Sequence, residues 1–73
     1  MPFSNSTTLE FKNDKNESYN LSIIDLNGQI VRQINNIKEN RLIIKKENLN
    51  AGLYYFILRN DKEIINKGKL LID

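Results

Sequence analysis

The side chains available for acid–base or metal chemistry are few, because the 73 residues include nine Asp and Glu, eleven Lys and Arg and three Tyr, but no Cys and no His. Without Cys and His the chain has no Ser–His or Cys–His nucleophile pair, no disulfide and none of the commonest zinc, copper or haem ligands. A glycosidase needs one carboxyl group in an apolar pocket and a second at roughly 5–10 Å. Every acidic residue here falls in an expected turn, at a strand end or on a polar face.

Other chemical signatures are also missing. Asp14 and Asn16 lack the alternate acceptor spacing and the closing Glu of a calcium loop, and no glycine-rich stretch could cradle a phosphate. We therefore expect a protein that is not an enzyme and that uses no cofactor or metal.

Charge and hydropathy exclude two further classes. The net charge is +2, and the basic residues are scattered among acidic ones, whereas a nucleic-acid footprint needs a clustered positive stripe. No run approaches the roughly 20 apolar residues of a membrane span, and the first residues lack the regions of a signal peptide. We expect no nucleic-acid partner and no membrane span. A chain of this length can support one hydrophobic core.

Short runs of alternating or continuous apolar residues recur about every ten residues, separated by turn formers and without an amphipathic helix. The expected strands cover residues 7–12, 19–25, 29–34, 41–45, 53–58 and 64–72, with a seventh if residues 2–6 pair at an edge. Residues 35–40 are expected to form a polar crossover, and Leu49 to plug the core beneath a loop. This spacing predicts an all-β antiparallel sandwich of six to seven strands.

The sharpest local signal is Asp25-Leu26-Asn27-Gly28, a hairpin turn between two apolar alternations. A two-residue turn would place Ile23 opposite Arg32. A type I turn followed by a left-handed Gly28 would place Ile23 opposite Val31 and Ile24 opposite Ile30. We favour the second register because apolar partners then match on both faces.

The strand at residues 53–58 is apolar on both faces. The inward face is expected to carry Tyr54, Phe56 and Leu58. The outward face is expected to carry Leu53, Tyr55 and Ile57. Such an outward face is either a contact site or is covered in part by neighbours on the same sheet, and the sequence leaves both open.

The last strand places Lys67 and Lys69 on one face and Leu70 and Ile72 on the other. Lysines on a terminal strand most often oppose unwanted edge pairing. An exposed edge on this terminal hairpin would nevertheless permit strand addition or a strand-addition dimer.

Four segments together resemble the C-terminal sorting domain of the type IX, or Por, secretion system of Bacteroidota. Pro2–Leu9 resembles its opening motif, Leu21–Val31 its central hairpin, Leu49–Tyr54 its Leu-x-x-Gly-x-Tyr motif and Lys67–Ile72 its closing Lys-rich strand. The match covers nearly the whole chain in the right order. Met1 stands where the family has Asn, and Ile57 where a polar residue is commoner.

This resemblance implies that residues 1–73 are one C-terminal sorting domain with an immunoglobulin-like sandwich, carried by an exported protein behind an N-terminal cargo domain. Such a domain is read in the periplasm by the outer-membrane translocon. A sortase-like cysteine peptidase then removes it, and the cargo is secreted or held at the cell surface. The alternative function is a carbohydrate-binding or adhesive module, which would need exposed aromatics or a calcium loop. The absence of Trp makes that signal thin.

The resemblance also suggests recognition residues, which are Gly52, Tyr54, Gly68, Lys69 and Leu70. For Gly52 and Tyr54 a turn and core packing are the favoured explanations. Lys69 has the better claim to direct contact, since a lysine at the surface contributes little to the fold.

Overall fold

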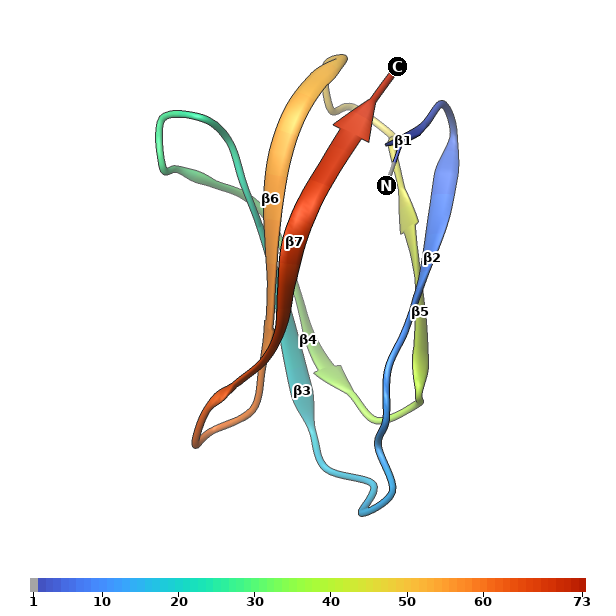
Figure 1. Ribbon diagram of the computed structural model, residues 1–73, viewed down its shortest axis with the longest axis vertical. Coiled ribbons are helices and arrows are strands. Elements are labelled where there is room, and N and C mark those ends of the chain that lie inside the picture. Colours follow the sequence, from blue (N-terminus) through green and yellow to red (C-terminus); the bar gives the residue numbers. More distant parts are fainter. Residues whose placement is uncertain (1) are drawn as a thin grey trace.

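Seven β-strands and no helix make up residues 2–73, which the computed structural model describes (Figure 1). Met1, which replaces the asparagine of the opening motif, lies outside the described residues. In chain order the strands are β1 (Pro2–Phe3), β2 (Ser6–Glu10), β3 (Tyr19–Ile24), β4 (Ile30–Ile37), β5 (Arg41–Lys45), β6 (Gly52–Arg59) and β7 (Ile64–Ile72). The prediction of an all-β sandwich is confirmed, and the seventh strand is the edge pairing expected of the first residues.

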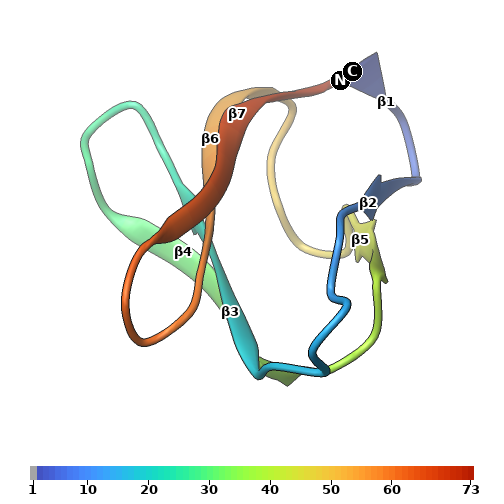
Figure 2. The ribbon, with the colours of Figure 1, turned by 60° about the horizontal axis from the view of Figure 1, so that its bottom comes forward.

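The strands form a five-stranded sheet in the order β1-β7-β6-β3-β4 and a two-stranded sheet of β2 and β5. Figure 2 shows the two sheets as separate layers on opposite sides of the core. All pairs are antiparallel except that of β1 with β7, where Pro2 lies opposite Leu71. The first and last strands therefore lie side by side, and β1 leads directly into the second layer.

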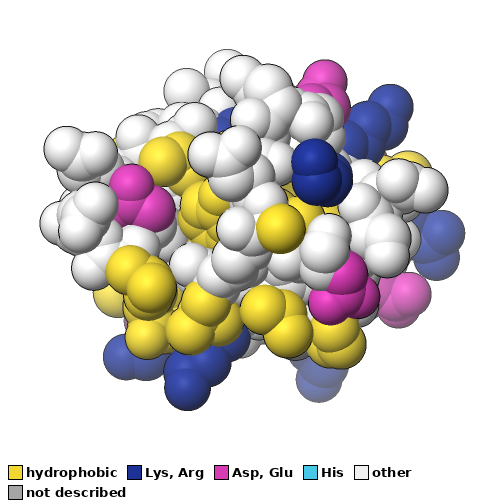
Figure 3. Space-filling view, turned by 90° about the horizontal axis from the view of Figure 1, so that it is seen from above, with side chains coloured by type: hydrophobic (Ala, Val, Ile, Leu, Met, Phe, Trp, Pro, Cys, Tyr) yellow, Lys and Arg dark blue, Asp and Glu magenta, His cyan; other side chains and the backbone are white. Residues whose placement is uncertain are grey.

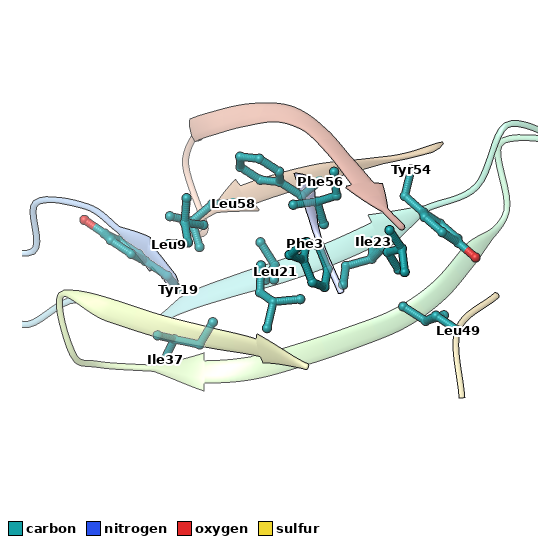
Figure 4. Packing of buried hydrophobic residues seen from close by; sticks show 13 residues of the cluster. Phe3, Leu9, Tyr19, Leu21, Ile23, Ile37, Leu49, Tyr54, Phe56 and Leu58 are labelled. Carbon is teal, nitrogen blue, oxygen red and sulfur yellow. The ribbon is translucent and has the colours of Figure 1, made fainter. Parts of the chain in front are cut away.

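The core lies between the layers because alternate residues of β3 and β6 turn the same way. Leu21, Ile23 and Leu58 are fully buried, and Ile44 of β5 meets them from the opposite sheet. Figure 4 shows Leu21, Ile23 and Leu58 in one cluster with the rings of Tyr19, Tyr54 and Phe56. Burying one such aliphatic side chain contributes about 1.5–3 kcal/mol. The predicted inward face of β6 and the plug formed by Leu49 are both confirmed.

The β3–β4 hairpin combines features of both expected registers. Gly28 is left-handed (φ 83°), and its N–H donates to the carbonyl of Asp25 as in the favoured turn. Ile24 lies opposite Ile30 as predicted, but Ile23 lies opposite Arg32 and not Val31. The predicted Ile23–Val31 pair is therefore wrong, because Val31 is an extra residue in a β-bulge.

The bulge turns Arg32 towards the inner side of the sheet, where its guanidinium joins the two layers. It donates to the backbone carbonyls of Lys45 and Lys46, the second at 3.1 Å, and lies 3.8 Å from the carboxylate of Glu47. A side chain on the outer face could not reach these carbonyls at the end of β5. This long-range contact explains why the register departs from simple apolar matching.

Several strand boundaries differ from the expected ones, mostly by one residue, and two differ by more. Strand β4 continues through Asn35 and Asn36 to Ile37, so the polar crossover predicted for residues 35–40 is wrong over its first three residues. Ile37 is buried opposite Tyr19, and the left-handed Asn36 (φ 59°) adjusts the register. The strand expected at residues 7–12 is shorter, because β2 ends at Glu10.

Candidate functional site

The outer face of the five-stranded sheet carries an apolar band across four strands. Tyr55 of β6 lies between Lys69 of β7 and Ile24 of β3, and Ile24 in turn lies opposite Ile30 of β4. Tyr55 is 39% exposed and Ile30 is 57% exposed. We call the outward residues Leu53, Tyr55 and Ile57 together with Ile24, Ile30 and Leu71 the outer apolar face.

This face is hollowed where β6 and β7 run side by side. The hollow on this face has a volume of about 550 Å³. A smaller hollow of about 360 Å³ lies at the end of the molecule formed by the β2–β3 loop and the β6–β7 turn, which we call the loop end. The lining residues of the larger hollow come from β3, β6 and β7 and are Ile24, Tyr55, Phe56, Ile57, Lys67, Gly68 and Lys69. Figure 3 shows exposed hydrophobic side chains gathered along one side of the molecule, with Lys and Arg side chains below them and an acidic side chain beside the row. The hollow is therefore an apolar floor with basic residues beside it.

The predicted recognition residues do not all come together on this face, although Gly68 and Lys69 both line the hollow. Tyr54 and Leu70 lie opposite each other on β6 and β7, and both are buried in the core. The Tyr54 hydroxyl donates to the backbone carbonyl of Asn50 at 2.8 Å, which satisfies the polar end of the ring. Lys69 lies on the opposite side of β7 and is exposed.

The two glycines among these residues have distinct local constraints. Gly52 begins β6 with φ 147°, a backbone conformation that residues with a side chain rarely adopt. Gly68 lies opposite Phe56, and a Cβ atom at position 68 would be 2.9 Å from Phe56 Cε1. The conformation of one glycine and the packing of the other therefore explain why the fold uses glycine at both positions.

The outward residues predicted on β6 do face away from the core. Tyr55 is exposed, whereas Leu53 and Ile57 are half-buried by neighbours on the same sheet. Ile24 also belongs to this surface but entered the sequence interpretation only as the cross-strand partner of Ile30. The signal that could have found it is an apolar residue out of phase with the buried Leu21 and Ile23.

The hollow at the loop end is polar. Its lining mixes basic and acidic side chains with Tyr19, including Lys15, Glu17 and Lys62. Burial, followed by the nearby Glu17 carboxylate, raises the pKa of the Tyr19 phenol above its ordinary value. Because charges of both signs alternate here, this hollow does not select one class of charged ligand.

Two features are absent from the described part of the chain. Among residues 2–73, no three acidic, Cys or His side chains cluster as they would around a metal ion. The described residues also include no apolar helix of the length needed to cross a membrane.

Comparison with known proteins gives one family. A family model described as secretion system C-terminal sorting domain matches residues 1–73. No curated protein and no solved structure matches the chain. The matched range covers all seven strands, both faces of the larger sheet and the four segments that resemble the sorting domain. The chain therefore belongs to the family of type IX secretion system C-terminal sorting domains.

Proposed function

We propose that this domain directs an N-terminal cargo through the type IX system, is read by the translocon in the periplasm and is then removed by a sortase-like cysteine peptidase. The observation that carries this proposal is the family match over residues 1–73. Family membership itself implies export to the cell surface or the medium. The proposal adds the order of events: recognition of the folded domain first, and cleavage upstream of it second.

In this role the domain is a substrate of the secretion machinery and not an enzyme. The absence of Cys and His from the sequence and the lack of a metal-ligand cluster among residues 2–73 support this assignment. A domain that serves as an address needs a stable fold and an accessible surface. The seven-stranded sandwich with its outer apolar face supplies both.

The predicted recognition residues fall into two groups under this proposal. Gly52, Tyr54, Gly68 and Leu70 act through the fold, since the two glycines meet local backbone and packing constraints and the other two side chains are buried. Lys69 lies on the outer face and is placed to contact the machinery. Substitutions in the first group should therefore reduce export only if they unfold the domain.

The cleavage step can be tested with a secreted fusion. A fluorescent protein is placed behind a signal peptide, followed by the native upstream linker and residues 1–73, and expressed in a host with a type IX system. Mass spectrometry of the exported protein should show the fluorescent protein without residues 1–73. A matched strain lacking the peptidase should retain the domain on the cargo. Exported cargo that carries the intact domain in both strains would contradict the proposed removal.

A further inference from the structure

We propose that the outer apolar face binds a segment of a partner protein in which acidic side chains flank apolar ones. This inference rests on the proposed function and identifies the surface and the chemistry by which the secretion machinery would hold the domain. It depends on two properties of the five-stranded sheet, the apolar hollow and the distribution of charge.

The hollow provides the apolar part of the contact. Tyr55 and Ile57 of β6 and Ile24 of β3 are adjacent across the paired strands and line it together. The hollow is open to solvent and has a volume of about 550 Å³. The exposed Ile30 and Leu71 extend the apolar surface to both sides. A partner can therefore bury an apolar side chain here and continue its contact along the sheet.

The charge on the sheet is of one sign. Strands β3, β4, β6 and β7 contain no acidic residue, although the chain has nine. They contain four basic residues, and Arg32 is the one turned inward. Arg59 and Lys67 lie on the same side of the sheet as Tyr55 and Ile57, as does Lys69. An acidic partner would meet attraction over this face, and no acidic residue of the four strands would oppose it.

The same observations argue against two other binding partners for the outer apolar face, a second copy of the chain and a lipid surface. A second copy of the chain placed face to face would bring together two surfaces whose charged strand residues are all basic, and like charges across an interface disfavour association. A lipid surface is entered by protruding apolar side chains, whereas Ile24, Tyr55 and Ile57 at the centre of this face line a hollow. A protein segment with a projecting apolar residue and acidic neighbours fits both the shape and the charge.

Binding can be measured on the 73-residue chain by NMR with a synthetic ten-residue peptide of alternating Glu and Ile as the probe. Shift changes should map to Ile24, Tyr55, Ile57 and Lys67. Lys67→Glu and Ile57→Thr should each weaken binding by about tenfold, equivalent to about 1.4 kcal/mol. The matched controls, Lys45→Glu and Ile43→Thr, alter exposed residues of the two-stranded sheet and should change affinity less than about twofold.

Several outcomes would overturn the proposal. One is that a peptide of alternating Lys and Ile binds as tightly as the Glu–Ile peptide. Another is that the shift changes are confined to the two-stranded sheet. A third is that the chain binds phosphatidylglycerol vesicles but neither peptide. Concentration-dependent dimerisation through this face would also contradict it. Thermal unfolding of each variant establishes that it is folded before its affinity is compared.

The secretion assay separates this inference from the proposed function. If the wild-type fusion is exported and the folded Lys67→Glu and Ile57→Thr fusions are exported equally well, the docking surface is wrong and the sorting function stands. If the wild-type fusion itself remains in the periplasm, the proposed function fails. Reduced export of these two variants, with normal export of the two controls, supports both the docking surface and the sorting function.

Discussion

Phe56 on β6 and Gly68 on β7 form a cross-strand pair in which the aromatic ring fills the space beside the glycine. A Cβ atom at position 68 would lie 2.9 Å from Phe56 Cε1 and 3.1 Å from Phe56 Cζ. The ring of Phe56 is itself buried in the core, so it has little room to move away. Gly68 therefore sets how closely the terminal hairpin packs.

Gly68→Ala should destabilise the domain. Glycine in a strand ordinarily costs about 0.5–1 kcal/mol relative to alanine, whereas overpacking a core costs about 1–3 kcal/mol. We expect the steric cost to dominate and the free energy of unfolding, measured by urea denaturation, to fall. Lys67→Ala on the same strand is the control and should change stability by less than about 0.5 kcal/mol. A stabilised Gly68→Ala protein would show that the ring adjusts without cost.

Arg32→Met should lower the free energy of unfolding, because it breaks the contacts that join the two layers at the end of β5. The substitution keeps an apolar stem but removes the donors to the carbonyls of Lys45 and Lys46, and hydrogen bonds made by charged groups are worth about 1.5–3 kcal/mol. Arg32→Lys should recover only part of this loss because one ammonium lacks the geometry of the guanidinium fork. The Glu47 carboxylate is largely exposed, so Glu47→Gln should cost less than about 1 kcal/mol. Equal losses for Arg32→Met and Glu47→Gln in chemical denaturation would assign the effect to the ion pair.

Tyr54→Phe tests the role of a residue that resembles a recognition motif. The change removes the 2.8 Å hydrogen bond to the carbonyl of Asn50 and keeps the buried ring, so we expect a loss of about 0.5–1.5 kcal/mol. Tyr55→Phe, on the exposed face of the same strand, is the matched control and should leave stability nearly unchanged. If Tyr54→Phe abolished export of a cargo without lowering the melting temperature, Tyr54 would be a contact residue and not a core residue.

The stability of the domain should fall in alkaline solution partly through Tyr19. Burial, and then the nearby Glu17 carboxylate, raise the pKa of this phenol in the folded state. Above the unfolded pKa of about 10, the unfolded chain loses the proton more readily than the folded one, so stability falls as the pH rises towards the folded pKa. Tyr19→Phe should show a shallower decline between pH 9 and pH 11 in thermal unfolding. An identical decline in both proteins would contradict this assignment.

Alternation along each strand was enough to predict the inner and outer faces of β6. Tyr54, Phe56 and Leu58 are buried as expected, because every second residue of a strand faces the same layer. The loop plug Leu49 was predicted from composition, since an apolar residue in a polar segment has a core to reach. These features depend on local pattern alone.

Features that depend on distant partners were not predictable in this way. The bulge at Val31 follows from the reach of Arg32 to Lys45, the last residue of β5 in the other sheet, and to Lys46 directly after it. Asn35 and Asn36 have the composition of a turn, but the burial of Ile37 opposite Tyr19 extends β4 through them. The constraint at Gly68 similarly depends on which residue of β6 it opposes, and the β6–β7 register shifts near the turn.

The recognition residues show the same limit. Motif resemblance grouped Tyr54 and Leu70 with Lys69, yet the first two face the core and Lys69 faces outward. A sequence motif in a sandwich this small combines residues needed for folding with residues available for contact. Only the side on which each residue lies separates the two groups.

The central claim is that this domain directs export through the type IX system, and export of a foreign cargo tests it most directly. A fluorescent protein behind a signal peptide, joined through the native linker to residues 1–73, is expressed in a type IX-competent host and in a matched strain lacking the translocon. We predict that the fusion reaches the medium or the cell surface in the first strain and stays in the periplasm in the second. A folded, intact fusion that remains in the periplasm of both strains would contradict the claim.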